Sequence, residues 1–148
     1  MTFTSRRGPL RQFAALPRGE RRLVLQLVAV ALTVRAAIRL APLTAIAAAI
    51  GRMRPRPGAA GIDPVRVAQL VDGTLDRLGS FTCLEKALTL WLALRRRGAH
   101  ATLTIGVRRN GRALAAHAWV DTAGVPLAGR PDGEYETICS FQSTATAA

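Results

Sequence analysis

Lysine is nearly absent from this chain of 148 residues, although the chain is strongly basic. Lys86 is the only lysine, so arginine supplies nearly all of the 21 positive charges, which stand against 9 carboxylates and give a net charge of +12. Such an excess favours an acidic partner: nucleic acid, an anionic membrane or an acidic peptide. Aromatic residues are also few, at 5%. Because no arginine cluster is interleaved with aromatics and no nucleic-acid-binding motif occurs, we expect no nucleic-acid partner.

Cysteine and histidine are scarce as well, with two of each. Cys83 and Cys139 are too few for a disulfide framework, and nothing requires a bridge between them. Neither a Cys-x-x-Cys motif nor a closely spaced pair of histidines occurs, so we expect no metal ion and no cofactor. Arg6 and Arg7 are not followed promptly by an apolar run with a cleavage site, which predicts a cytoplasmic location.

Hydrophobic runs long enough to span a bilayer are also missing. The two apolar runs, residues 23–34 and 40–51, are shorter than the roughly 20 residues that a spanning helix needs. Arg35 and Arg39 separate these runs and lie one helical turn apart. We therefore predict a pair of helices packed on the core, with peripheral contact to an anionic membrane through residues 20–50 as the alternative.

Composition divides the chain into three parts. Residues 1–50 form a predicted N-terminal helical region, and residues 51–61, rich in glycine, proline and arginine, form a predicted linker. Residues 62–148 form the main domain. It begins with a helix over residues 63–78, for which Asp63 is the predicted N-cap.

Residues 80–98 carry the signals of a complete helix at both ends. Thr82 and Glu85 predict a capping box, and Gly98 suits the position just beyond the C-terminus. Cys83 is then the first helical residue, where unpaired backbone amides and the positive end of the helix dipole stabilise a thiolate. Taken alone, Cys83 is more simply interpreted as a small packing residue. One apolar stripe is predicted on this helix, made by Leu84, Ala87, Leu88, Trp91, Leu92 and Leu94.

The pattern changes to strands after this helix. Strands are predicted over residues 101–107, 114–121, 125–128 and 135–141, with a hairpin at Asn110-Gly111 and a second turn over residues 121–124. The order of helices followed by an antiparallel meander predicts an α+β fold.

Two histidines are candidate partners for Cys83. His100 follows the far end of a helix of about 22 Å, so it is a poor partner. His117 lies in the middle of a predicted strand between small residues. If that strand crosses the start of the helix, its imidazole can act as a base for the Cys83 thiol, whereas a half-buried strand residue is the simpler interpretation of His117 alone. Trp119, on the same strand face, is expected to fill the core.

These residues together form a more specific pattern. The elements are Cys83-Leu84, Ala87-Leu88, Leu90-Trp91, Leu94, Arg97-Gly98, residues 103–107 and Ala116-His-Ala-Trp-Val120. In this order and spacing, the chain resembles the leader peptidases, or B proteins, of lasso-peptide biosynthesis, a family within the transglutaminase-like cysteine proteases. The resemblance covers about residues 62–139.

The resemblance implies a papain-like or transglutaminase-like fold, in which a small antiparallel sheet packs on the catalytic helix. Cys83 would be the nucleophile and His117 its base, in a peptidase that cuts a ribosomally made precursor peptide between leader and core. A separate leader-binding protein would present the precursor, and a lactam-forming synthetase would close the ring. An acyltransferase or amidase on the same scaffold, or a non-catalytic protein at a membrane surface, is the alternative.

The residue that orients His117 is less well defined by the sequence. Asp121 lies four residues along the same strand, about 13 Å away in an extended chain. Asp132 is the predicted third member of the triad, although its local sequence is also that of an ordinary turn. Glu134 or a backbone carbonyl is the alternative. The backbone amide of Cys83 is the expected donor of an oxyanion hole.

Overall fold

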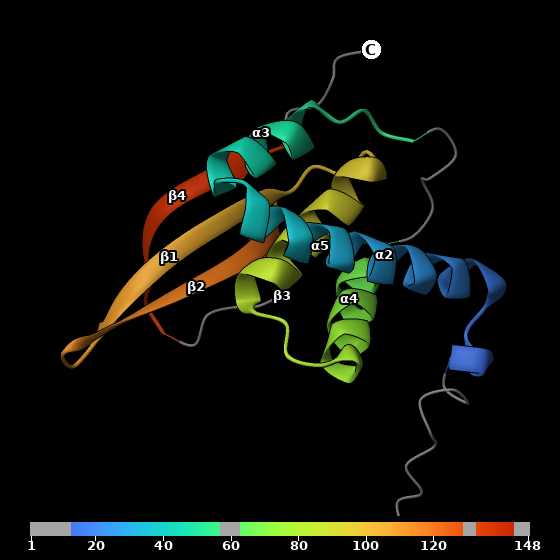
Figure 1. Ribbon diagram of the computed structural model, residues 1–148, viewed down its shortest axis with the longest axis horizontal. Helices are drawn as coiled ribbons and strands as arrows, with labels where there is room; N and C mark the ends of the chain where they lie inside the picture. The colour runs from blue at the N-terminus through green and yellow to red at the C-terminus, as the bar shows by residue number, and fades with distance from the viewer. Residues whose placement is uncertain (1–12, 57–62, 129–132, 144–148) are drawn as a thin grey trace, which may run out of the picture.

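The structure is a computed structural model that describes residues 13–56, 63–128 and 133–143. Its helices are α2 (Arg18–Leu40), α3 (Leu43–Arg52), α4 (Pro64–Leu78) and α5 (Cys83–Arg96). Its strands are β1 (Thr102–Asn110), β2 (Ala113–Thr122), β3 (Val125–Ala128) and β4 (Glu136–Gln142). Helices therefore precede an antiparallel sheet, and the predicted α+β class is confirmed (Figure 1).

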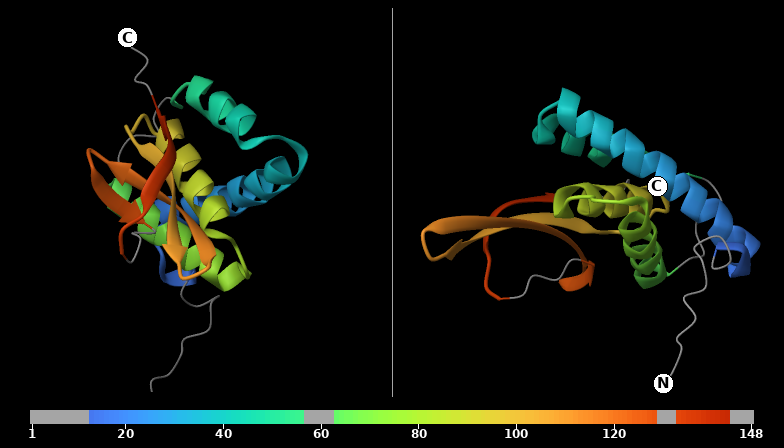
Figure 2. Two further views of the ribbon diagram at one scale, coloured as in Figure 1. Left: turned by 90° about the vertical axis from the view of Figure 1, so that its left-hand side faces the viewer. Right: turned by 60° about the horizontal axis from the view of Figure 1, so that its bottom comes forward.

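The sheet has the strand order β3-β2-β1-β4, and each neighbouring pair is antiparallel. The predicted meander is correct for β1 to β3 but wrong for β4, which returns to the other edge of β1. The reason lies in the core, where Phe141 of β4 pairs with Leu103 and reaches Trp91 of α5, with ring centroids 6.4 Å apart. Figure 2 shows the helices on one side of the curved sheet, with the β1–β2 hairpin extending beyond them.

Helix α5 lies at the centre of the molecule rather than on its surface. The predicted single stripe is wrong, because α2, α4 and the sheet enclose the helix. Its buried residues run without a break over residues 87–95. Thr89 Oγ1 donates to the Glu85 carbonyl within the helix at 2.7 Å, and Arg95 Nη2 donates to the Gly51 carbonyl of α3 at 3.0 Å. Each of these two buried side chains therefore makes at least one hydrogen bond in the interior.

The ends of α5 are as the sequence predicts. The Glu85 amide donates to Thr82 Oγ1 at 3.2 Å, and the Thr82 amide donates to Glu85 Oε2 at 2.7 Å, which completes the capping box. Gly98 has a φ of 75°, the left-handed conformation that favours glycine beyond a helix C-terminus. Asp63 is the N-cap of α4, as expected, but its side chain makes no capping hydrogen bond.

The N-terminal helices share one core with the rest of the chain. Buried residues of α2 and α3 join those of α4, α5 and the sheet in a single hydrophobic cluster. Pro42 is the N-cap of α3, which ends at Arg52, so the helix extends into the predicted linker. The remainder of that linker lies partly outside the described residues. The division into residues 1–50, 51–61 and 62–148 stays a prediction.

Helix α2 is longer than either of the apolar runs in the sequence. Its best window has a mean hydropathy of 1.9, so by length and composition it is the one helix in the described ranges that could cross a membrane. The core helix of a soluble protein passes the same test. Leu23, Leu27 and Val34 are buried, whereas Leu25 and Leu32 are exposed. One side of α2 therefore belongs to the core, and membrane contact through residues 20–50 stays a prediction.

Gly106 tests the packing of the central strand β1. A Cβ atom at this position would lie 2.9 Å from the Trp119 ring and 3.0 Å from the Glu136 carbonyl oxygen. We expect Gly106→Ala to lower the free energy of unfolding by about 1–3 kcal/mol, measured by chemical denaturation, because both neighbours must shift. Gly51→Ala is the matched control, since open space surrounds Gly51. Equal stability of Gly106→Ala and wild type would contradict this close packing.

Candidate active site

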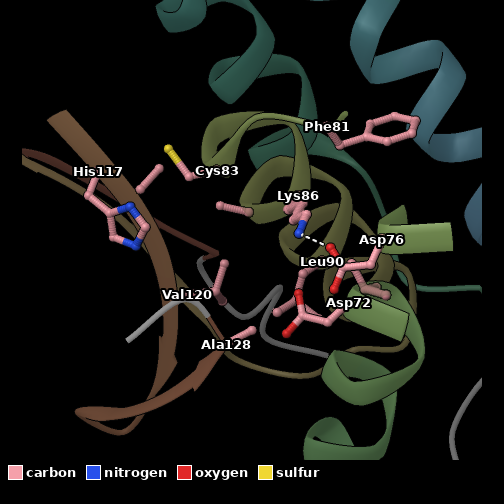
Figure 3. A pocket seen from close by; sticks show the side chains of 12 residues that line it. Asp72, Asp76, Phe81, Cys83, Lys86, Leu90, His117, Val120 and Ala128 are labelled. Carbon is pink, nitrogen blue, oxygen red and sulfur yellow. Dashed lines mark hydrogen bonds and ion pairs between the residues drawn. The ribbon is translucent and has the colours of Figure 1, made fainter. Parts of the chain in front are cut away.

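A pocket of about 290 Å³ lies between α4, α5 and the sheet. Cys83 and His117 both line it (Figure 3). The other lining residues are Val71, Asp72, Asp76, Phe81, Lys86, Ala87, Leu90, Ala118, Val120 and Ala128. The fold therefore brings the predicted nucleophile and the predicted base to one cavity, although they are 34 positions apart in the sequence (117 − 83).

Cys83 is the first residue of α5 and is half-buried, with a free thiol. The capping box occupies the amides of Thr82 and Glu85. Amides in the first turn have no acceptor within their own helix, so those of Cys83 and Leu84 are positioned to donate to a negative charge beside the sulfur. The start of α5 thus combines a thiol with first-turn amides, the arrangement that a nucleophile and an oxyanion hole need, and both roles stay predictions.

His117 approaches the pocket from β2. Ala118 and Val120 of this strand are buried in the core cluster, so alternation turns His117 and Trp119 to the opposite face. β3 pairs with β2 only from Val120 onward, and no described strand covers that edge of β2 beside His117. This edge position explains how a side chain on the far face also lines the cavity beside Cys83.

The imidazole of His117 is held by aromatic neighbours. It stacks on Trp119, with centroids 6.4 Å apart and planes 20° apart, and it contacts Tyr135 at 5.7 Å. The expectation that Trp119 fills the core is wrong, because this ring is half-buried and packs on His117 and over Gly106. Two aromatic rings therefore lie beside the imidazole and limit the space in which it can turn.

The candidates for the residue that orients His117 come from β2 and from the segment that precedes β4. Asp132, the predicted member of the triad, lies outside the described residues. Asp121 accepts a long hydrogen bond of 3.4 Å from Thr104 Oγ1, and Glu134 is exposed next to Tyr135. The orienting group for His117 therefore stays a prediction.

Arg35 of α2 is a residue that the sequence analysis does not assign to the site. Its Nε atom donates to Glu85 Oε1 at 2.7 Å, and its Nη2 atom donates to the Ser80 carbonyl at 2.6 Å. Its guanidinium also lies 3.8 Å from the centroid of the Phe81 ring, at cation–π distance. One side chain from the N-terminal region thus holds three residues at the entry to α5. The sequence shows only that Arg35 and Arg39 lie between two apolar runs, and this does not identify the partner of Arg35.

Arg35 also changes the ionisation of the capping carboxylate. Its hydrogen bond to Glu85 is the main cause that lowers the pKa of this carboxyl from 4.5 to about 2, against the opposing effect of burial. The hydrogen bond from the Thr82 amide acts in the same direction as Arg35. Glu85 is therefore ionised at neutral pH, although its side chain is only 11% exposed. Its negative charge at the helix N-terminus also suits the dipole.

The site contains the parts of a thiol-dependent acyl-transfer enzyme. A cysteine beside first-turn amides and an imidazole on the same pocket can form and resolve an acyl-enzyme. Within the ranges that the structure describes, no group of three His, Cys, Asp or Glu side chains is placed to hold a metal ion.

Comparison with known families agrees with this class. The model of the transglutaminase-like superfamily matches residues 27–140, and the chain belongs to that superfamily. The superfamily includes cysteine peptidases and acyltransferases. The match begins within α2, so it covers part of the N-terminal helical region as well as the pocket. Comparisons with curated proteins and with solved structures gave no match.

Proposed function

We propose that this protein is a cysteine peptidase that removes the leader from a ribosomally made lasso precursor peptide. The observation that supports it most is the shared pocket of Cys83 and His117 in a chain of the transglutaminase-like superfamily. The lasso-type motifs around these two residues supply the substrate class. A separate leader-binding protein and a lactam-forming synthetase are the proposed partners.

In the proposed reaction, the Cys83 thiolate attacks the carbonyl carbon of the last leader residue. The first-turn amides of α5 stabilise the oxyanion, and protonated His117 donates its proton to the amine of the core peptide as the C–N bond breaks. Water then attacks the thioester, with His117 as base. The leader leaves as a carboxylic acid, and the thiol is regenerated.

The test is incubation of the protein with a lasso precursor peptide and its leader-binding protein, followed by mass spectrometry. Hydrolysis gives a leader acid and a core peptide whose masses sum to that of the precursor plus one water. A leader joined to an added amine would instead indicate an acyltransferase. An unchanged precursor in the presence of the partner would contradict the peptidase assignment.

A further inference from the structure

The candidate active-site pocket extends away from the reacting groups. Cys83 and His117 lie at one end, whereas Asp72 and Asp76 of α4 lie at the other, beside Lys86 (Figure 3). Apolar residues also line the pocket: Val71, Ala87, Leu90, Ala118 and Val120. The cavity thus combines apolar sides with a charged far end, the shape expected for one substrate side chain next to the reacting bond.

The charged end is unusual for this protein, because the chain as a whole has a net charge of +12 and only 9 carboxylates. Lys86 Nζ forms an ion pair with Asp76 Oδ1. Asp72 is half-buried and has no ion pair or hydrogen bond from any side chain in the described ranges. Asp72, Asp76 and Lys86 together carry a formal charge of −1. Because Lys86 pairs with Asp76, the remaining negative charge is that of Asp72.

Burial shifts the pKa of Asp72 more than the charges of its neighbours do. Burial raises the pKa of this carboxyl, Asp76 raises it further, and the positive charge of Lys86 only partly offsets them. A half-buried carboxylate without a donor is costly to leave unpaired. A donor arriving with a ligand would remove that cost, and a cation would remove the most.

We propose that this pocket binds a basic side chain of the substrate, next to the bond that Cys83 attacks, with Asp72 as its acceptor. Arginine fits best: its methylene groups can lie along the apolar walls, and its guanidinium can bind a carboxylate through two parallel hydrogen bonds. The inference rests on the proposed function, because only a peptide laid across Cys83 would place a side chain in this cavity.

The test uses peptide chloromethyl ketones, which place a ketone where the scissile carbonyl would lie and a reactive chloromethyl carbon beside it. The Cys83 sulfur displaces chloride and forms a thioether, so the mass of the intact protein reports the rate of modification. One series carries arginine, citrulline or glutamate as the last residue, and a second series varies the residue before it. Citrulline has nearly the shape of arginine without its charge, which isolates the contribution of the cation.

In one of the two series, we expect the arginine probe to modify wild-type protein at least about 10-fold faster than the citrulline probe. Asp72→Asn should bring the two rates close together. Lys86→Met should widen the difference, because it removes the competing cation. Asp63→Asn is the matched control on the same helix, since that exposed side chain makes no capping bond, and it should leave the preference unchanged.

Two outcomes would overturn the inference: equal arginine and citrulline rates in both series for wild type, or an arginine preference that survives in Asp72→Asn. Iodoacetamide, which enters without a side chain, measures the reactivity of the Cys83 thiol in each protein, and each peptide-ketone rate is divided by the iodoacetamide rate of the same protein. If iodoacetamide reacts with Cys83 but none of the peptide ketones does, the proposed peptidase function fails instead.

Discussion

Replacement of Cys83 by alanine should abolish cleavage of the precursor, with a loss of at least about 10³-fold in the single-turnover rate. The reason is that no other group in the described pocket can form the acyl-enzyme. Replacement of His117 by alanine should lower the same rate by about 10²- to 10⁴-fold, because the amine would leave without a proton donor. Both rates are measured by mass spectrometry with excess enzyme over precursor and its leader-binding partner.

The chain offers a matched control for each of these variants. Cys139→Ala removes the other free thiol, which lies on β4, and His100→Ala removes the other imidazole, which is exposed beyond α5. Both control proteins should cleave at the wild-type rate. Cleavage at that rate by Cys83→Ala or His117→Ala would show that the peptidase assignment is wrong. Circular dichroism checks that Cys83→Ala is folded, so that a loss of cleavage can be assigned to the missing thiol.

Local signals in the sequence predict the helix that carries the nucleophile. Thr82 and Glu85 act within the first turn of α5, and Gly98 acts just beyond its last turn. Each end of the helix is therefore specified by residues next to it. The position of Cys83 follows directly from that cap. The hairpin at Asn110-Gly111 is predicted for the same reason, because turn geometry depends on adjacent residues.

Features that depend on contacts distant in the sequence could not be predicted in the same way. The pairing of β4 with β1 and the enclosure of α5 on all sides depend on which elements meet in the core. Arg35 shows this for the site: its partner Glu85 lies 50 positions away, and nothing local to α2 identifies it. Likewise, Asp72 lines the pocket only because α4 packs beside α5.

The Arg35–Glu85 pair should make folding stability depend on pH in a defined window. Because the pKa of Glu85 is about 2 in the folded protein and ordinarily 4.5, the folded state holds the negative charge more strongly than the unfolded chain does. The stabilisation is therefore complete above about pH 4.5, falls as the pH falls towards 2, and is absent below that. We expect a contribution of about 1–3 kcal/mol at neutral pH, since solvent reaches the partly exposed guanidinium of Arg35.

Glu85→Gln isolates this effect, because glutamine can still accept a hydrogen bond from the Thr82 amide and keeps the capping box. The variant should be less stable than wild type at pH 7, and the difference should shrink between pH 4.5 and 2 in urea titrations. The comparison is between the two proteins, since the raised pKa of Asp72 changes both curves in the opposite direction. Glu20→Gln, which breaks the more exposed pair with Arg66, is the control and should have a smaller effect. A difference between Glu85→Gln and wild type that stays constant across this range would show that the ionisation of Glu85 does not contribute to the free energy of unfolding.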